Sequence, residues 1–408
     1  MSSVDTASPR PRHLRLVRPV AASRSRADAA SRPTVALLLG STAFLVAIGL
    51  LMVLSASSVS AFAQYGDSFV FVQRQAAYAV VGVGALLLTS RMRPEAWRRL
   101  AWPFLLVTVA MLVFVLVPSA GIEAYGSSRW FQLGPVTVQP SELAKLSLVV
   151  FAAALLARKW GRLDDLGHLA IPLLPVCAIV LALVMLQPDL GTTVILAGAV
   201  FLLLFAAGVR LRYLSFAGLV GAAVGAGLIM SADYRRIRFL SFLDPWEDAK
   251  STGYQLVQSL IALGSGGWTG VGLGASRQKW QYVPNAHNDF VFSILGEELG
   301  LIGEIVVLVA FCTLIYAGLK IATRTTDVFS RLLAAGIVSW FGMQALINLG
   351  AVTGLLPITG VPLPFLSYGG SSLVVSLAAV GVLVAIARAP ARAAAPTRSV
   401  GKRRSRAA

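Results

Sequence analysis

Charged side chains are scarce in this sequence, making up 13% of its 408 residues against 57% hydrophobic ones. A soluble domain carries roughly twice that charged fraction, so the composition disfavours a water-soluble fold and indicates a bilayer as the solvent. Only two cysteines occur, Cys177 and Cys312. Both lie inside apolar runs, so we predict packing roles for them and no disulfide framework.

Histidines and the common signatures of soluble enzymes are also scarce. Of three histidines, only His287 falls in a segment expected on the extracytoplasmic side, which disfavours a histidine-rich metal site. The glycine run 264–274 lacks the Lys-Ser/Thr pair that ends a phosphate-binding loop, so we predict a flexible turn there. No Gly-x-Ser-x-Gly elbow is present, which disfavours a protease or esterase.

Positive charge is abundant, with a net charge of +17, but much of it lies at the two ends. Residues 1–33 and the segment from Arg388 onward hold seven basic residues each, fourteen of the 35 in the chain. We predict basic, disordered tails at 1–33 and 389–408, because Pro/Ala/Ser/Arg-rich segments cannot pack a core. Such tails orient a membrane protein and contact anionic membrane lipid, so no nucleic acid is expected as a partner. The first tail has no apolar h-region, and no cleavable signal is predicted.

Long uncharged runs divide residues 34–388 into membrane spans, each of which needs about 20 apolar residues. The uncharged stretch 332–387 is too long for one span and is interrupted by Pro357, Pro362 and Pro364. The expected fold class is therefore an all-α polytopic membrane protein with ten transmembrane helices. They are predicted at about 34–66, 75–90, from 101, 142–157, 169–188, 190–209, 214–232, 290–319 and two within 332–387.

Loops rich in Lys and Arg alternate with loops that lack them, and basic loops stay on the cytoplasmic side. The basic loops are 91–100, 158–168, 209–213 and 320–331, whereas 57–71, 118–141 and 352–369 carry only Arg129. Both termini are therefore predicted to be cytoplasmic, with a large extracytoplasmic loop, 233–289, between helices seven and eight. Its amphipathic stretch 254–263 suits either a helix at the membrane interface or a lid packed on the bundle.

Asp289 ends this outer loop and opens the eighth predicted span. A carboxylate at the lipid–water boundary is partly desolvated, which raises its pKa towards that of a useful general base. Aspartate is also a favoured helix N-cap. The residue types alone leave both interpretations open.

Other polar residues at the predicted outer face also allow two interpretations. Arg129 with Trp130 suits a phosphate grip or an interfacial anchor. Asp189 suits a ligand contact or a helix cap. The basic residues of the outer loop suit a solvated surface or a pyrophosphate partner; they are Arg235, Arg236, Arg238, Arg277 and Lys279.

Two sets of ionisable residues fall near or inside predicted spans. In the segment 139–145, Ser141 or Glu142 could cap a helix, and Glu142 with Lys145 has the i,i+3 spacing of an ion pair. Glu297 and Glu304 are seven residues apart in the eighth span, so we predict that they share a helix face and line an interior polar path.

Several segments together resemble one family. They are Arg129-Trp130, Gln139-Pro140-Ser141-Glu142 with Lys145, Gln187-Pro188-Asp189-Leu190-Gly191-Thr192, Gly264-Ser265-Gly266-Gly267, His287-Asn288-Asp289-Phe290 and Pro364-Phe365-Leu366-Ser367-Tyr368-Gly369-Gly370-Ser371-Ser372. In this order they are similar to the shape, elongation, division and sporulation (SEDS) proteins, over about 35–388. The stretch 275–287 is more similar to the division member than to the elongation member.

The resemblance implies a peptidoglycan glycosyltransferase that polymerises lipid II during septal wall synthesis, as a multi-pass protein of the bacterial cytoplasmic membrane. It implies Asp289 as the catalytic general base and undecaprenyl pyrophosphate as the leaving group. A class B penicillin-binding protein and other divisome proteins are the implied partners. No cofactor is firmly expected, a divalent cation (Mg²⁺ or Mn²⁺) being the candidate. Substrate-binding residues expected at the site are Arg129, Trp130, Gln139, Ser141, Glu142, Lys145, Asp189, Arg277, Lys279, His287, Ser367 and Ser371.

This sequence departs from the family pattern at Asn288, where threonine is common, and at Glu304, where such proteins are usually apolar. Two other functions remain open: a lipid II flippase, and a non-catalytic scaffold that activates a penicillin-binding protein. The candidate residues gather at one predicted face, whereas alternating access needs a site near the midplane, which favours the enzyme.

Overall fold

The computed structural model describes residues 20–117, 122–124, 127–134, 136–162, 165–280 and 287–389. The remainder of the two predicted tails, 1–19 and 390–408, lies outside the described residues. Helix α1 begins at Val20, within the segment predicted as a tail, and continues to Tyr65.

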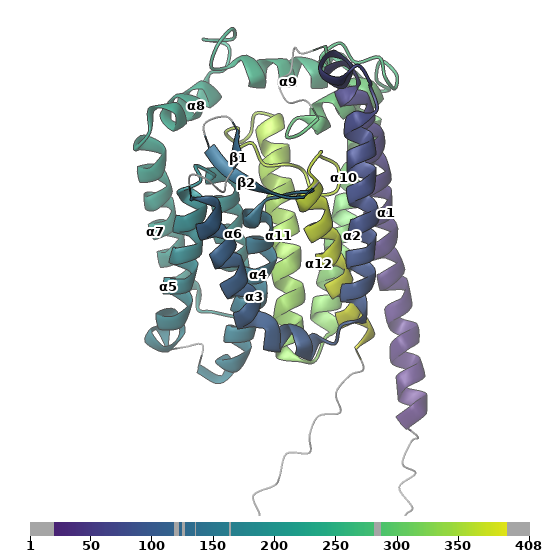
Figure 1. The fold of residues 1–408 in the computed structure, drawn as a ribbon. Helices are drawn as coiled ribbons and strands as arrows, with labels where there is room; N and C mark the ends of the chain where they lie inside the picture. The colour runs from purple at the N-terminus through teal and green to yellow at the C-terminus, as the bar shows by residue number, and fades with distance from the viewer. Residues whose placement is uncertain are drawn as a thin grey trace, which may run out of the picture.

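The described residues form a helical bundle in which each predicted span overlaps one helix (Figure 1). Among them, eight helices are long and apolar enough to cross a bilayer, and α5 and α6 are shorter apolar helices. Helix α1 begins and helix α12 ends at the same end of the bundle (Figure 1). The bundle helices are α1 (Val20–Tyr65), α2 (Val70–Arg91), α3 (Pro94–Val115), α4 (Pro140–Arg158), α5 (Leu166–Met185), α6 (Leu190–Ala206), α7 (Leu211–Met230), α10 (Val291–Arg324), α11 (Val328–Val352) and α12 (Gly370–Arg388).

The centre of the bundle is formed by α4, α11 and α12, which are buried over most of their length, whereas α7 is almost wholly exposed. A helix that is apolar on all faces is typical of such a position. Glycine lets α12 approach α2 closely, since a Cβ at Gly381 would lie 2.3 Å from the Leu86 carbonyl oxygen. Small residues serve this purpose in membrane helices, where close packing drives association.

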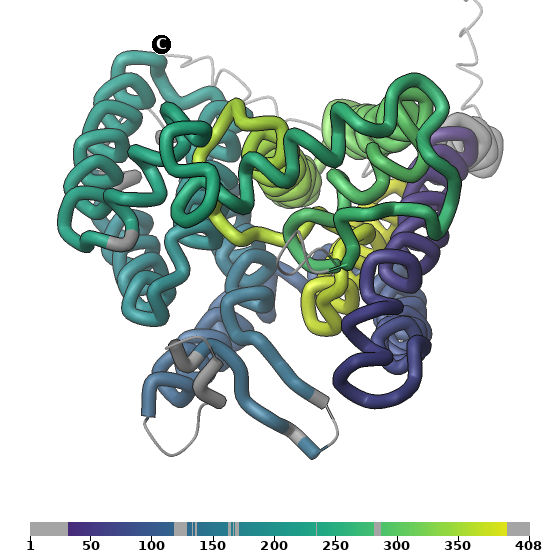
Figure 2. The backbone as a smooth tube through the Cα atoms, turned by 90° about the horizontal axis from the view of Figure 1, so that it is seen from above, coloured from purple at the N-terminus to yellow at the C-terminus, as the bar shows by residue number. Residues whose placement is uncertain are grey.

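The outer loop forms two helices, α8 (Asp233–Leu243) and α9 (Tyr254–Ser265), which lie across the end of the bundle opposite the start of α1 and the end of α12 (Figures 1 and 2). Helix α9 buries Leu256 and Val257. The Ser259 hydroxyl is 2.7 Å from both the Ser293 hydroxyl and the Val352 carbonyl oxygen. Of the two interpretations of this stretch, the lid packed on the bundle is therefore confirmed.

A small antiparallel sheet departs from the all-α prediction. Its strands are β1 (Ile122–Ala124), β2 (Ser127–Leu133) and β3 (Val136–Val138), in the order β1-β2-β3. Gly134, with φ +62°, lies in the β2–β3 hairpin and supplies the left-handed residue that such a turn requires. The strands are too short to be distinguished from a turn by periodicity. The remaining element is a single 3-10 turn, η1 (Trp160–Arg162).

Helix α10 is interrupted at Gly300, whose φ of 64° and ψ of −169° are open almost only to glycine. A break frees backbone groups that must find partners, and the glycine run supplies them. Four backbone hydrogen bonds of 2.9–3.2 Å do so: Leu301 to Gly267, Ile302 to Trp268, Val271 to Glu297 and Gly272 to Glu298. The shared face predicted for Glu297 and Glu304 is wrong, because the break lies between them.

The break divides α10 into two parts with different tasks. Residues 301–324 would be about 36 Å long at 1.5 Å per residue, which is enough to cross about 30 Å of hydrocarbon without the rest of the helix. The part before Gly300 is buried on nearly every side, from Val291 to Glu298. This short half-helix is the element that Asp289 precedes.

Candidate functional site

The candidate residues gather at one end of the bundle, where α4, α6, α10 and α12 begin and α11 ends. The loop 353–369, between α11 and α12, lies at the centre of this end. A Cβ at Gly191, at the start of α6, would lie 2.9 Å from the Thr359 carbonyl oxygen, and one at Gly360 would lie 3.7 Å from Asp289 Oδ2. The loop therefore contacts both the segment 187–192 and the candidate catalytic residue.

Asp289 does not cap the half-helix that follows it. The N-cap residue of α10 is Phe290, and no side chain bonds to the first turn from that position. Burial raises the pKa of the Asp289 carboxyl to about 6, although its own backbone amide and the charge of Arg238 both act to lower it. The capping interpretation is wrong, and the carboxyl group has the pKa of a general base that works near neutral pH.

Two amide side chains of α11 hold the backbone around Asp289. Asn348 Nδ2 donates to the carbonyl oxygens of Asp289 (2.8 Å) and Val361 (2.7 Å). Gln344 Nε2 donates to the Pro362 carbonyl oxygen at 2.8 Å. From α2, Gln75 Nε2 donates to the Ser367 carbonyl oxygen at 3.1 Å. Three amides thus clamp the loop 353–369 through its main chain.

Lys145 lies in the bundle interior, 1% exposed, with its Nζ 2.7 Å from Glu142 Oε2. It also donates to Gln344 Oε1 at 3.0 Å, and its Nζ lies 5.4 Å from the centre of the Trp340 ring. The predicted ion pair is confirmed. The predicted cap by Ser141 or Glu142 is wrong, since Gln139 is the N-cap residue of α4 and makes no side-chain capping bond. Through Gln344, the ion pair supports the loop 353–369.

Arg129, on β2, reaches across to the turn between α5 and α6. Its Nε donates to the Gln187 carbonyl oxygen and its Nη2 to the Pro188 carbonyl oxygen, both at 2.8 Å. Asp189 caps α6, accepting from the Thr192 amide at 3.0 Å and the Thr192 hydroxyl at 2.8 Å. The capping interpretation of Asp189 is confirmed, and Arg129 braces the same turn. Trp130 follows on β2 and is half-buried.

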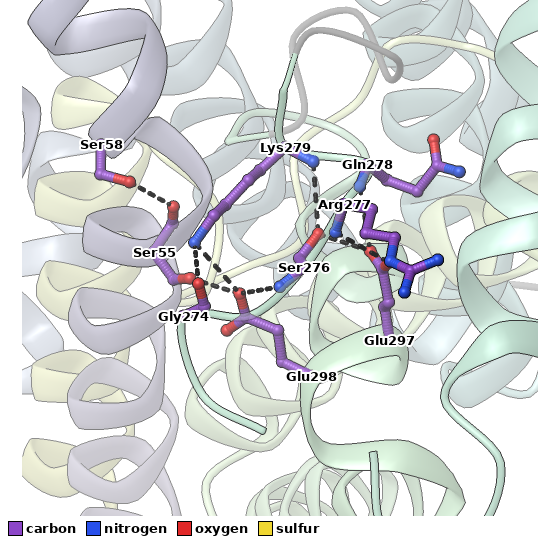
Figure 3. A network of polar contacts seen from close by, with 9 residues as sticks. All are labelled: Ser55, Ser58, Gly274, Ser276, Arg277, Gln278, Lys279, Glu297 and Glu298. Atoms are coloured by element: carbon purple, nitrogen blue, oxygen red, sulfur yellow. Dashed lines mark hydrogen bonds and ion pairs between the residues drawn. The ribbon is translucent and has the colours of Figure 1, made fainter. Parts of the chain in front are cut away.

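Two buried glutamates at the end of the half-helix hold the segment 274–280 (Figure 3). Glu297 accepts from the Ser276 hydroxyl and from the Arg277 amide, the latter at 2.9 Å. Glu298 accepts from the Ser55 hydroxyl of α1 at 2.5 Å and lies 3.8 Å from Lys279 Nζ. These carboxylates therefore join the outer loop to α1 and α10 rather than line a path through the bundle.

The two basic residues expected at the site from this segment differ in their surroundings. Lys279 is 9% exposed and donates to the Gly274 carbonyl oxygen as well as pairing with Glu298. The side chain of Arg277 is exposed. Only Arg277 of the two offers its cationic group to a ligand at the surface.

Two serines were expected at the site from the segment 364–372, and they lie where the loop 353–369 meets α12. Ser367 Oγ accepts from the Leu363 amide at 2.8 Å and so closes the turn before α12. Ser371 is in the first turn of α12 and is half-buried. His287 is joined to this turn by its carbonyl oxygen, which accepts from the Tyr368 amide at 2.9 Å. Burial lowers the pKa of His287 to about 4, so this ring is neutral at physiological pH.

Sequence reasoning missed the residues that organise the site. Gln75, Gln344 and Asn348 were not singled out, nor was Arg238 as the cation that acts on Asp289. The signal was present for the amides, because an uncharged polar side chain within an apolar span must find hydrogen-bond partners when buried. The partners themselves, which are loop carbonyl groups, carry no sequence signal.

The described residues contain no group of three or more His, Cys, Asp or Glu side chains placed to hold a metal ion. The divalent cation considered from the sequence thus lacks a protein ligand set within this part of the chain. Such an ion would have to take most of its ligands from phosphate and water, as Mg²⁺ commonly does.

Comparison with known proteins agrees with this architecture. The model of the FtsW/RodA/SpoVE family, described as cell cycle proteins, matches residues 35–391. A probable peptidoglycan glycosyltransferase FtsW of Geobacter metallireducens is 44% identical over 340 residues, 83% of this chain and 91% of that protein. The stage V sporulation protein E of Bacillus subtilis is 42% identical over 349 residues, 85% of this chain and 95% of that protein.

Two solved structures are similar in fold. A chain from a study of the structural coordination of polymerization and crosslinking by a peptidoglycan synthase complex has a TM-score of 0.70 and 30% identity, covering 86% of this chain and 96% of that one. The rod shape determining protein RodA of Thermus thermophilus has a TM-score of 0.64 and 29% identity, covering 86% and 95%.

Fold and site together define a multi-pass helical membrane protein whose buried charged residues gather at one end of the bundle. With the family model covering residues 35–391 and relatives above 40% identity over most of the chain, the protein belongs to the FtsW/RodA/SpoVE family.

Proposed function

We propose that the protein is a peptidoglycan glycosyltransferase, which polymerises lipid II into glycan strands during septal cell-wall synthesis. The activity is supported by the name of its 44% identical relative, a probable peptidoglycan glycosyltransferase. The observation that carries the chemistry is Asp289, a non-capping carboxyl group with a pKa raised to about 6 by burial. An ordinary aspartate, with a pKa near 4, is a weaker base.

In this mechanism Asp289 takes the proton from the 4-hydroxyl group of the acceptor sugar. The oxygen of that hydroxyl group attacks the anomeric carbon of the donor at the same time. The bond from that carbon to the phosphate oxygen breaks, and undecaprenyl pyrophosphate leaves with the bonding electrons. A carboxyl group with a pKa of about 6 is ionised at neutral pH and still basic enough to accept the proton. The hydrogen bond from Asn348 to the Asp289 carbonyl oxygen supports the position of the base.

Exposed cations stabilise the charge that develops on the pyrophosphate. Arg238 acts electrostatically on Asp289, and Arg277 presents an exposed guanidinium from the outer loop. Lys145, Lys279 and Arg129 are bonded to protein groups. For these three we assign the positioning of the loops around the substrate in place of the direct contact expected from the sequence.

The proposed topology has ten transmembrane helices with both tails in the cytoplasm and the loop 233–289 outside. It is supported by the ten apolar helices that overlap the predicted spans and by the common end of the bundle at which α1 begins and α12 ends. The proposed location is the bacterial cytoplasmic membrane at the division septum. A class B penicillin-binding protein is the proposed partner, and this is supported by the similarity to a chain from a peptidoglycan synthase complex.

The test is polymerisation of purified lipid II by the protein in detergent, alone and with its matched penicillin-binding protein. Asp289→Asn should lower the rate by about 10²–10⁴-fold, the usual contribution of a general base. Because burial raises the pKa of this carboxyl from 3.8 to about 6, ionisation of the group costs stability progressively between these two pH values, and the full cost remains above pH 6. Asp289→Asn removes that cost and should unfold at an equal or higher temperature above pH 6.

Three outcomes would contradict the proposal in different ways. Full polymerisation by Asp289→Asn would remove the residue from the mechanism. A lipid II flippase would move substrate across vesicle membranes and form no strands in detergent, where no compartments exist. A scaffold would stimulate its partner equally well with Asp289→Asn as with the unaltered protein.

A further inference from the structure

Five aromatic rings and one arginine lie together beside the candidate catalytic residue. Phe71 is at their centre, with its ring 5.0 Å from that of His287, 5.3 Å from that of Tyr368 and 5.8 Å from that of Tyr65. The guanidinium carbon of Arg74 lies 5.4 Å from the centre of the Tyr65 ring. The fifth ring is that of Tyr78, which lies near enough to Tyr368 to act on its hydroxyl electrostatically and whose own hydroxyl accepts from the Thr137 amide of β3 at 3.3 Å.

These rings are not part of the bundle interior. Phe290, which follows Asp289 directly, is 2% exposed, as a core residue should be. In contrast, Phe71, His287 and Tyr368 are half-buried, and Arg74 is exposed. The cluster therefore holds its rings in place against one another while it leaves part of their surface open.

The cluster is joined to Asp289 through the main chain and its hydrogen bonds. His287 is two residues before it, and its carbonyl oxygen accepts from the Tyr368 amide at 2.9 Å. Gln75, one residue after Arg74, donates to the Ser367 carbonyl oxygen and accepts from the Gly369 amide at 3.2 Å. A ligand placed on these rings would be held at a set distance from the carboxyl group.

The chemistry of the cluster suits an acidic sugar. Aromatic faces carry partial negative charge and attract the polarised C–H groups of a sugar ring, and burial keeps His287 neutral by lowering its pKa to about 4. Burial raises the pKa of the Tyr368 hydroxyl, and the charge of Arg74 opposes that rise, so the guanidinium lies near this end of the cluster. Arg74 is exposed and its guanidinium has five N–H donors, which can bond to an anionic oxygen.

We propose that Phe71, Arg74, His287 and Tyr368 form a subsite that binds a sugar ring with an anionic substituent, next to Asp289. The subsite rests on the proposed glycosyltransferase function and adds to it the residues that hold one of the two sugars. The anionic group is a carboxylate of the muropeptide or a phosphate oxygen of its lipid pyrophosphate.

The test uses the lipid II polymerisation assay. It compares variants that remove the ring of Phe71 or the charge of Arg74 with variants that keep them. Arg74→Gln should raise KM by about tenfold or more with kcat nearly retained, since a hydrogen bond to a charged group is worth about one to two factors of ten. Phe71→Leu removes only an aromatic face and should raise KM by about two- to tenfold, again with kcat nearly retained. Phe71→Tyr and Arg74→Lys should recover most of the loss. Phe69→Leu is the aromatic control, being 54% exposed one residue before α2. Arg212→Gln is the charge control, since Arg212 also lies over a tyrosine ring, that of Tyr213.

Competition identifies the anionic group. A soluble muropeptide without the lipid pyrophosphate should inhibit the unaltered protein more strongly than Arg74→Gln if the carboxylate is bound, and inorganic pyrophosphate should do so if the phosphate is bound. Arg74 is exposed, so Arg74→Gln remains informative if Phe71→Leu does not fold.

The subsite would be overturned if the Phe71 and Arg74 variants all had the KM of the unaltered protein. It would also be overturned if their KM rose only when the partner protein is present. Either result would leave the role of Asp289 intact. If the proposed role of Asp289 were wrong, the sign would be different: Asp289→Asn would polymerise lipid II at the full rate.

Discussion

Asp289 is subject to opposing influences on its pKa. Burial favours the neutral carboxyl group, whereas the charge of Arg238 favours the carboxylate, and the pKa settles at about 6. The residue can therefore exchange a proton near physiological pH, which an aspartate in water does not do.

This balance predicts the pH dependence of polymerisation. A general base must be ionised, so kcat/KM should fall with a slope of one proton as the pH drops through about 6. Arg238→Gln removes a charge that lowers the pKa of Asp289, so the acid limb should move to higher pH, most clearly at low salt. The measurement is a pH–rate profile of each protein. Arg236→Gln, on the same helix, is the control and should leave the limb in place. An acid limb that does not move in Arg238→Gln would show that this arginine does not act on the base.

Residue types alone identified where the polar chemistry gathers, but not which group performs it. Asp189 and Asp289 are both aspartates at the start of an apolar helix. The first bonds to the Thr192 amide, whereas Phe290 takes the N-cap position in the second case. The difference depends on backbone torsions at one residue, which local sequence does not determine.

At the scale of the elements, α10 combines a membrane span with a half-helix that carries the site. Gly300, Gly266 and Gly270 meet at the junction, where a Cβ at Gly266 would lie 2.0 Å from the Gly296 carbonyl oxygen. Any side chain at these positions would push the glycine run away from the backbone groups it satisfies.

Gly300→Ala should therefore be severely destabilising, by about 3 kcal/mol or more, because it combines a left-handed φ with a Cβ 2.4 Å from the Gly270 amide nitrogen. Thermal unfolding of the detergent-solubilised protein measures this. Gly225→Ala is the matched control: it lies in α7 with nothing within 4 Å of its Cβ, and should be neutral or slightly stabilising. Equal unfolding temperatures for the two variants would contradict the assigned role of the break.

The positions of the helices were predictable from sequence, and the internal structure of one of them was not. Apolar length identifies a span, and each predicted span overlaps a helix. The predicted span that contains Gly300 gives no sign of the break, because the partners that stabilise it come from residues 267–272, about 30 positions earlier. The strands β1 to β3 were not predicted for a related reason, since they are defined by their pairing with one another and not by their composition.

At the scale of the whole molecule, the proposal requires the polar end of the bundle to face away from the cytoplasm. Every element that contributes to the site begins or ends there, as do α8 and α9. Charge in the short loops predicts the orientation, and packing alone does not.

Cysteine labelling in intact cells tests this orientation. In a background where Cys177 and Cys312 are replaced by alanine, a cysteine at the exposed Glu247 should react with a membrane-impermeant maleimide. A cysteine at the exposed Arg93, between α2 and α3, should react only after the cells are permeabilised. Labelling in the opposite order would place Asp289 on the cytoplasmic side, where no wall strand is assembled.

The three amides that clamp the central loop have a consequence for mutational tolerance. Gln75, Gln344 and Asn348 bond to main-chain oxygens of the loop 353–369, and every amino acid carries such an oxygen. Substitution at Pro362 would leave its carbonyl oxygen available to Gln344, whereas exchange of Gln344 would abolish that bond. A saturation scan should accordingly find fixed positions on the helices and more permissive ones on the loop they hold, the reverse of what a membrane bundle ordinarily displays.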